Sequence, residues 1–247
     1  MRKEDVRQMK WLENWLYSAC FKKFHDNCLI GDQPFFDKKL LRATGVLEAA
    51  HPFIRHEVEH LLKRYDELAP FQTMSPEQES LTEGDNWKFF FLKCARFRFR
   101  KNIRLMPKTM KIIEKYPEIV SAYLSILAPG ASLAPHRGPW AGVLRAHLGV
   151  IIPPPNRWGV RPHIIVAGQR YEWREGEVVF FDDTYPHEAH NPTDNFRVVL
   201  FMDILRPMKQ PWHQINKFIL LCIWMFPYFW VPYLNHRRWE KSFYRDG

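Results

Sequence analysis

The chain has little cysteine, and the cysteine it has forms no motif. Cys20, Cys28, Cys94 and Cys222 are scattered over 247 residues, and no Cys-x-x-Cys occurs. This pattern excludes a zinc ribbon and a disulfide framework, and it is typical of a reducing compartment. The N-terminus carries acidic residues and lacks a continuous apolar stretch, so we expect no signal peptide. Internal repeats and low-complexity tracts are also missing.

A second absence concerns the surroundings of histidine. None of the eleven histidines is followed two positions later by Asp or Glu. The common iron site built from two histidines and one carboxylate takes two of its ligands from such a motif. A complete site of that kind is therefore not encoded in its expected form.

The bulk composition predicts a folded, basic protein. Hydrophobic residues make up 46% of the chain and aromatic residues 15%, which is enough for a packed core and excludes global disorder. The net charge is +9, with basic runs at 96–104 and 235–245. Such charge suits an anionic partner, for example a membrane surface or a phosphorylated lipid. A solvated face that favours solubility is the simpler interpretation of the charge alone.

Residues 1–86 are predicted to form an N-terminal helical layer. Apolar residues follow helical spacing between Leu12 and Cys20, and again between Val58 and Leu68. Polar residues over 71–86 indicate a loop that ends this layer.

From residue 87 to residue 207 the pattern indicates a mainly β domain. A short helix over 107–116 is predicted inside it. The predicted strands lie at 87–93, 120–127, 142–152, 163–167, 169–173, 177–182 and 196–205. Many short strands separated by Gly and Pro turns favour a sandwich or a barrel.

Alternation within these strands separates an apolar face from a polar one. In 142–152, Leu144 and Ala146 belong to the apolar face, whereas Arg145 and His147 lie opposite. Ser125 and Arg197 also avoid the apolar faces of their strands. Polar side chains from several strands are therefore expected to share one side of the sheet.

Residues 208–247 are predicted to form a hydrophobic C-terminal segment. The run from 218 to 234 carries no charge, and it is flanked by Lys217 and by Arg237 with Arg238. A spanning helix needs roughly 20 apolar residues, and two prolines interrupt this run. We interpret it as a kinked interfacial or re-entrant anchor on a membrane. The alternative is an apolar tail packed on the core.

His136 and His187 are the candidate metal ligands. His136 follows a proline at a turn, and His187 lies at the end of a strand, where a rigid backbone can hold an imidazole in place. Arg145 and His147 follow shortly after His136, and Arg197 lies ten positions after His187. Because a buried arginine is costly without a carboxylate, these arginines predict a small dicarboxylate ligand beside the metal.

Ordered motifs connect these residues to a known family. They read His136-Arg-Gly-Pro, Leu144-Arg-Ala-His-Leu-Gly, Trp173-Arg-Glu-Gly, Phe181-Asp-Asp, His187 and Arg197. On these motifs, residues 119–207 resemble the aspartyl/asparaginyl β-hydroxylase family of Fe(II)/2-oxoglutarate dioxygenases. The resemblance covers about a third of the chain. It implies a double-stranded β-helix, or jelly roll, with the N-terminal helices packed on it.

The resemblance also implies roles for the individual residues. His136 and His187 would ligate Fe(II), with 2-oxoglutarate and O₂ as co-substrates. Arg197 and Ser125 would hold the distal carboxylate of 2-oxoglutarate, and Arg145 and His147 would contact its other end.

By the same resemblance, Gly138 stands at the position of the third iron ligand. The glycine would leave two protein ligands, with water in the third place. Asp182 and Asp183 are possible substitutes, although support of His187 from behind the ligands fits Phe181-Asp-Asp better.

The substrate stays open between two classes. The residues around His136 and the ending Arg206-Pro207 resemble bacterial lipid A 2-hydroxylases and related lipid acyl hydroxylases, which carry Asp where this chain has Gly138. Animal peptidyl Asp/Asn hydroxylases carry Gly there.

The first hypothesis is therefore a hydroxylase of a membrane-lipid acyl chain, at the cytoplasmic face of a membrane. The second is a peptidyl β-hydroxylase. The third is a non-catalytic jelly-roll binding module. We expect no nucleic-acid partner.

Overall fold

The computed structural model describes residues 21–74, 81–82, 84–222 and 227–245. The strands are β1 Phe35–Phe36, β2 Trp87–Cys94, β3 Phe97–Arg98, β4 Ile119–Leu127, β5 Ser132–His136, β6 Val143–Ile151, β7 His163–Val166, β8 Gln169–Glu172, β9 Val178–Phe181, β10 His187–His190 and β11 Arg197–Leu205. The helices are η1 Lys38–Leu40, α2 Thr44–Ala49, α3 His51–Leu62, η2 Tyr65–Glu67, α4 Phe71–Met74, α5 Arg100–Leu105, α6 Pro107–Ile113, α7 Trp212–Cys222 and α8 Pro227–Phe243. The helix expected between Leu12 and Cys20 lies outside the described residues.

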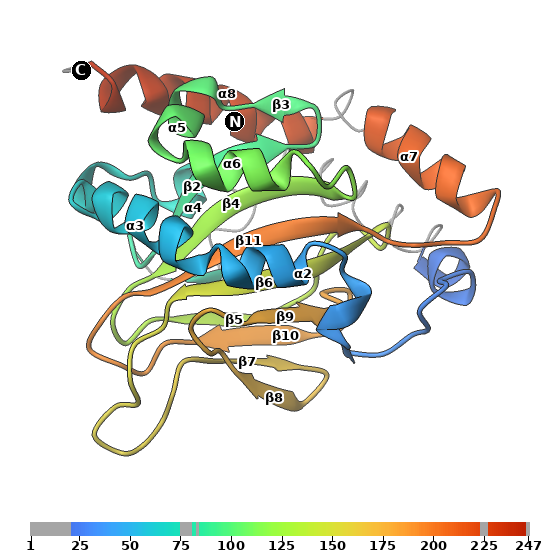
Figure 1. The fold of residues 1–247 in the computed structure, drawn as a ribbon, viewed down its shortest axis with the longest axis horizontal. Helices are drawn as coiled ribbons and strands as arrows, with labels where there is room; N and C mark the ends of the chain where they lie inside the picture. The colour runs from blue at the N-terminus through green and yellow to red at the C-terminus, as the bar shows by residue number, and fades with distance from the viewer. Residues whose placement is uncertain (1–20, 75–80, 83, 223–226, 246–247) are drawn as a thin grey trace.

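Within the described residues the strands form two antiparallel sheets. The larger sheet has the order β1-β9-β6-β11-β4-β2-β3, and the smaller has the order β5-β10-β7-β8. From β4 to β11 the chain passes back and forth between the two sheets, which is the winding of a double-stranded β-helix. Figure 1 shows the larger sheet between a layer of helices and the smaller sheet. The predicted jelly roll with helices packed on it is confirmed.

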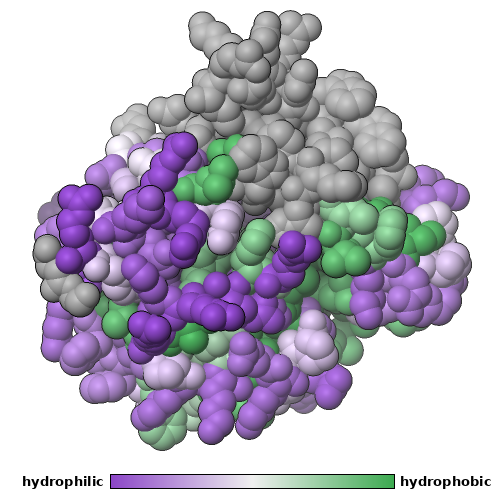
Figure 2. All heavy atoms as spheres, turned by 90° about the horizontal axis from the view of Figure 1, so that it is seen from above, coloured by the Kyte–Doolittle hydropathy of each residue, from purple (hydrophilic) through white to green (hydrophobic). Residues whose placement is uncertain are grey.

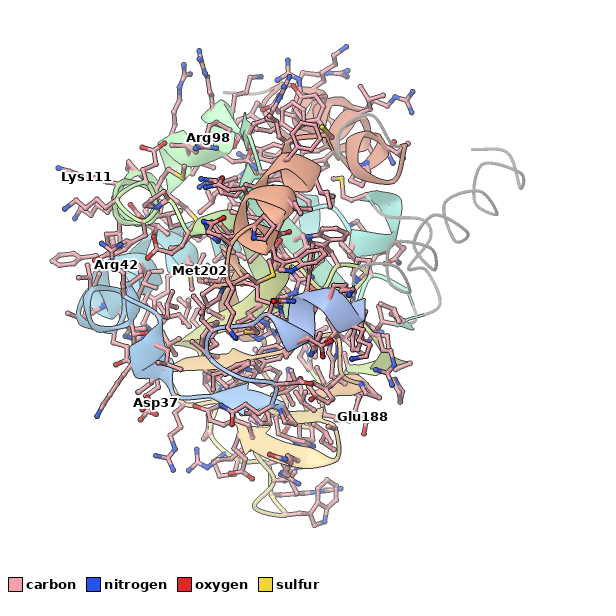
Figure 3. The ribbon with its side chains drawn as sticks, turned by 90° about the vertical axis from the view of Figure 1, so that its right-hand side faces the viewer. Asp37, Arg42, Arg98, Lys111, Glu188 and Met202 are labelled. Carbon is pink, nitrogen blue, oxygen red and sulfur yellow. The ribbon has the colours of Figure 1, made fainter. Side chains whose placement is uncertain are left out.

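The two faces of the larger sheet have different neighbours. Leu144 and Ala146 of β6 and Met202 of β11 are fully buried in the core that also contains the apolar residues of α2, α3 and α6. Met202 lies inside the molecule in Figure 3. Because side chains alternate along a strand, burying this row under helices directs Arg145 and His147 into the space between the sheets.

The helical layer departs from its prediction in detail. Helix α3 ends at Leu62 and is followed by the separate turn η2, so the predicted helix to Leu68 is too long. The predicted loop after residue 70 begins with the short helix α4. A buried carboxylate joins two of the helices, because Glu57 of α3 accepts hydrogen bonds from the backbone N–H groups of Lys108 and Thr109 at 2.8 and 3.1 Å. Glu57 thereby satisfies free donors in the first turn of α6.

The prediction of one hydrophobic C-terminal segment is not supported. The segment forms two helices, and the second half of α8 packs on the core, with His236, Glu240 and Phe243 buried. Phe243 lies with its ring centroid 6.3 Å from that of Phe90 in β2. The uncharged run from 218 to 234 does not indicate the packing of the second half of α8, because the residues that pack on β2 come after residue 234. No described helix is long and apolar enough to cross a membrane.

Candidate active site

One cavity between the two sheets collects the predicted site residues. It encloses about 750 Å³, partly open to solvent. All seven predicted positions line it, namely Ser125, His136, Gly138, Arg145, His147, His187 and Arg197. Aromatic side chains form much of the remaining wall, among them Trp87, Tyr123, Trp173, Phe181 and Phe201. The cavity is thus a small polar cluster inside an apolar enclosure, which is typical of a ligand site.

Strand pairing brings the two candidate metal ligands together. His136 ends β5 and His187 begins β10, and the two residues are directly opposite in the antiparallel register. Their ring centroids are 4.1 Å apart. The Nδ1–H of His136 donates to the carbonyl of Ala134 at 2.8 Å, and the Nδ1–H of His187 donates to that of Tyr185 at 3.0 Å. Because a carbonyl only accepts, both imidazoles keep the lone pair of Nε2 for a metal.

The surroundings hold both imidazoles neutral. Burial, together with the neighbouring His187, lowers the pKa of His136 to about 4. Burial likewise lowers the pKa of His187. Neutral imidazole is the state that coordinates a metal, so no proton has to be displaced from either ring near pH 7.

The inner end of the cavity carries a cation with no anion beside it. Arg197 is 1% exposed, and no described carboxylate lies within ion-pair distance of it. Its Nη1 lies 3.4 Å from Oγ of Ser125, its Nε has no hydrogen-bond partner among the described residues, and its guanidinium lies over the Trp173 ring. Burial lowers the pKa of Arg197 to about 9. An uncompensated buried cation is strongly destabilising, so this end fits an anionic ligand.

His147 lies at the same end and is equally unsatisfied. Neither of its ring nitrogens has a hydrogen-bond partner within the described part of the chain. Burial and the adjacent Arg197 hold its pKa well below the usual range. Buried polar atoms are nearly always satisfied in proteins, so these atoms also indicate a polar ligand. The donor set fits a carboxylate co-substrate next to a metal held by the histidine pair.

Arg145 differs from Arg197, although the sequence pattern treats them alike. Its Nε lies 2.6 Å from Oδ2 of Asp183, and its Nη1 forms an ion pair with Asp203. Two carboxylates of the chain therefore already balance its charge. The inference of a dicarboxylate ligand consequently rests on Arg197 and not on both arginines.

Asp183 occupies the space beside Gly138. The Gly138 N–H donates to the Asp183 carbonyl at 2.7 Å, and a Cβ at position 138 would lie 1.9 Å from Oδ2 of Asp183. The other carboxylate oxygen of Asp183, Oδ1, is buried without a partner among the described residues. A side chain at position 138 and the present position of Asp183 exclude each other.

Asp182 is not among the residues that line the cavity with the histidine pair. Its Oδ2 lies 2.5 Å from Nη2 of Arg206, and its Oδ1 accepts from the Thr184 hydroxyl at 2.7 Å. Asp182 also belongs to a group with His25 and Asp32 in which possible ligand atoms lie within 4.8 Å of one another. Arg206 already neutralises the Asp182 carboxylate. The contacts of His25 with Asp32 and Thr184 give this group a structural role, because they tie residues 21–32 to the loop before His187.

Comparison with known proteins identifies the family. Residues 48–207, more than half of the chain, match the family described as Aspartyl/Asparaginyl beta-hydroxylase. The chain belongs to the aspartyl/asparaginyl β-hydroxylase family.

The names of relatives within this hydroxylase family give different substrates. An ornithine lipid ester-linked acyl 2-hydroxylase of Rhizobium tropici is 38% identical over 218 residues, which cover 88% of this chain and 76% of that protein. The aspartyl/asparaginyl beta-hydroxylase of Homo sapiens is 34% identical over 141 residues, which cover 55% of this chain and 18% of that protein. Among solved structures, a Pseudomonas putida prolyl-4-hydroxylase is 15% identical with a TM-score of 0.40, and covers 63% of this chain and 87% of that one.

Several site residues of this β-hydroxylase family member are not evident from the sequence pattern. Trp87 donates from Nε1 to Oγ of Ser125 at 3.0 Å and so orients that hydroxyl. Trp173 covers Arg197, and Asp203 pairs with Arg145. The sequence gives only a weak signal for these contacts. An indole N–H requires a partner when buried, and Asp203 shares a strand face with Arg197.

Proposed function

We propose that this chain is an Fe(II)/2-oxoglutarate-dependent dioxygenase that hydroxylates the acyl chain of a membrane lipid. The observation that carries the dioxygenase class is the uncompensated Arg197 in the same cavity as two neutral, oriented imidazoles. Support for a lipid substrate comes from the Rhizobium tropici acyl 2-hydroxylase, which aligns with 88% of this chain.

Each part of the cavity has a task in this reaction. Nε2 of His136 and Nε2 of His187 would hold Fe(II), and Arg197 with Ser125 would bind the distal carboxylate of 2-oxoglutarate. When bound, Fe(II) with 2-oxoglutarate and O₂ supplies the oxidation that inserts oxygen into an unactivated C–H bond, with succinate and CO₂ as the other products. The aromatic walls exclude water from the reacting centre. Arg145 holds Asp183 beside Gly138, the position at which a third protein ligand would stand.

A membrane surface is the proposed location of the substrate, on its cytoplasmic side. Helix α7 exposes Ile215, Phe218 and Leu221, which recur every three residues and share one side of the helix. Hydrophobic spheres gather on the right-hand side of Figure 2, where α7 lies, next to hydrophilic ones. Lys217 on the same helix is exposed. An apolar stripe beside basic residues suits the interface of an anionic membrane.

A peptidyl Asp/Asn β-hydroxylase is the second candidate. Gly138 favours it, since the peptidyl hydroxylases resembled by the sequence carry glycine there. The human relative aligns with 55% of this chain, whereas the lipid acyl hydroxylase aligns with 88% of it.

One assay separates these candidates from a non-catalytic module. The purified full chain is incubated with Fe(II), 2-oxoglutarate, O₂ and either lipid extract or Asp/Asn-containing peptides, and products are read by mass spectrometry. We expect one added oxygen on an acyl chain, with stoichiometric succinate, and no product from His136→Ala. Oxygen on peptides alone would support the second candidate. Normal metal binding without any succinate would leave only a binding module.

A further inference from the structure

A second hollow adjoins the cavity that contains His136 and His187, which we call the metal cavity. The proposed reaction assigns no task to this second hollow. It lies between β4, β6, α7 and the loop that follows His136, and it encloses about 590 Å³. Val120, Val143, Trp140 and Leu220 line it. Pro139 and Arg145 line both this hollow and the metal cavity. We call it the side groove.

We propose that the side groove binds the acyl chain of the lipid substrate and delivers one of its carbons to the metal cavity. This inference rests on the proposed function, since it assigns the substrate path for that same site. It commits to one occupant, a single unbranched acyl chain. An extended peptide is the alternative occupant, and the oxygenated products distinguish it from an acyl chain.

The chemistry of the lining separates the groove from the cavity. In the metal cavity, His147, Trp173, Asp183 and Arg197 all carry buried polar atoms without partners among the described residues. None of the described residues that line the side groove has such an atom. A peptide would bring backbone N–H and C=O groups that need partners in a buried site, whereas an acyl chain brings none. The groove therefore favours an apolar ligand.

The charged groups that line the groove are already paired with each other. Arg145 and Asp203 form an ion pair there. Their pairing leaves the hydrocarbon parts of Val120, Val143 and Leu220 as the contact surface. Burying methylene groups against such a surface is favourable because it removes apolar area from water.

Helix α7 connects the groove to the outer surface and to the metal site. Leu220 faces the groove, while its neighbour Leu221 is 60% exposed on the outer side. Buried Asn216 fixes the helix, because it accepts from Nε1 of Trp140 at 3.1 Å and donates to the Gly142 carbonyl at 2.7 Å. These contacts hold α7 against the loop that contains Gly138. A chain that leaves a lipid layer at the outer side of α7 and enters the side groove would therefore lie beside Pro139 and Arg145, which also line the metal cavity.

Photo-cross-linking locates the chain without relying on turnover. The full-length protein, loaded with metal, is irradiated with a 16-carbon fatty acid that carries a diazirine near the middle of its chain, in mixed micelles. We expect labelled peptides to contain 139–143 or Leu220. Labels confined to the outer side of α7, or spread over the surface, would overturn the proposal.

A matched pair of variants tests the same point. Leu220→Trp fills the groove, whereas Leu29→Trp makes the same replacement at a leucine that is 59% exposed and lines neither the groove nor the metal cavity. We expect Leu220→Trp to lose at least tenfold of the groove labelling and to shift the hydroxylated products towards shorter chains. Leu29→Trp should keep groove labelling. Unfolding curves establish that both variants are folded.

The outcome distinguishes two kinds of failure. If the wild type hydroxylates lipid while Leu220→Trp labels and reacts like Leu29→Trp, the groove assignment is wrong and the function stands. If the wild type oxidises only peptides, the proposed function itself fails, and absence of groove labelling then contradicts this proposal as well.

Discussion

At the scale of single residues, the cavity contains two buried arginines with opposite requirements. Arg145 has two carboxylate partners from the chain, and Arg197 has none among the described residues. The burial cost of Arg197 is a property of the protein without ligand, and a bound carboxylate would offset it. We therefore propose that binding of the carboxylate co-substrate and relief of this cost are one event.

Replacing Arg197 tests this assignment. We expect Arg197→Met to weaken 2-oxoglutarate binding by about 30- to 100-fold, because hydrogen bonds to charged groups contribute about 2–3 kcal/mol. Binding of 2-oxoglutarate to the metal-loaded protein, followed by calorimetry, measures the change. Arg174→Met, at a surface arginine whose side chain is 72% exposed, is the matched control and should bind normally. Unaltered affinity in Arg197→Met would remove the carboxylate site from this end of the cavity.

Gly138 and Asp183 are predicted to be energetically coupled. Gly138→Ala should destabilise the fold by about 1–3 kcal/mol, because its Cβ would lie 1.9 Å from Oδ2 of Asp183 and the Asp183–Arg145 ion pair would have to shift. In an Asp183→Ala background the same change should cost less than about 1 kcal/mol, since the obstructing carboxylate is gone.

Urea unfolding of the four proteins in this double-mutant cycle measures the coupling. Gly45→Ala in α2, where a Cβ meets nothing within 4 Å, controls for the general effect of replacing glycine. Additive costs for Gly138→Ala and Asp183→Ala would show that Asp183 does not obstruct a side chain at position 138.

At the scale of elements, α8 is attached through a buried histidine. His236 accepts a hydrogen bond from Nδ2 of Asn102 at 3.0 Å, and the same amide donates to the Phe91 carbonyl of β2 at 2.8 Å. Burial lowers the pKa of His236 to about 3. Between about pH 6.5 and pH 3 the unfolded chain binds a proton here that the folded chain does not. The free energy of unfolding should therefore fall as the pH decreases through this window.

The prediction is a difference in pH dependence between wild type and a variant. In His236→Gln, which retains an acceptor for Asn102, we expect the loss of stability between pH 6 and pH 4 to be smaller than in wild type by about 1–2 kcal/mol. Denaturant unfolding at several pH values measures it. His60→Gln, on the exposed side of α3, should follow the wild-type curve. Parallel curves for wild type and His236→Gln would exclude His236 as the source.

The elements also show how far sequence reasoning reaches. Alternation predicted the long strands and the side on which Ser125, Arg145, His147 and Arg197 lie, because a buried face fixes the phase of a strand. It missed β5 and β10, which are short and have little apolar alternation, although their pairing sets His136 opposite His187.

Partners far apart in sequence were likewise out of reach. Nothing local to Arg145 indicates that Asp203 would pair with it from β11, 58 positions away, or that Asp183 would fill the space beside Gly138. In α8, Trp239 and Phe243 pack on the core and follow the hydrophobic run that suggested a single anchor. Tertiary contacts decided these points, whereas local periodicity decided the strands.

At the scale of the whole molecule, three features follow one another in space. The apolar stripe of α7 lies outside, the side groove lies behind the helix, and the metal cavity shares Pro139 and Arg145 with that groove. The net charge of +9 supplies a long-range attraction to an anionic surface that does not depend on this arrangement. Charge and apolar contact should therefore be separable experimentally.

Vesicle binding by the full chain separates the two contributions. We expect co-sedimentation with vesicles that contain anionic phospholipid, weaker binding to neutral vesicles, and partial release by salt, because ions screen the charge but not the apolar contact. Phe218→Ser with Leu221→Ser should weaken binding more than tenfold even at low salt, since each side chain contributes about 1.5–3 kcal/mol when fully buried. Phe53→Ser, which removes a 56% exposed phenylalanine from α3, should bind like wild type. Equal losses in the α7 and α3 variants would mean that charge alone brings the protein to the surface, and α7 would then have no part in presenting the lipid to the groove.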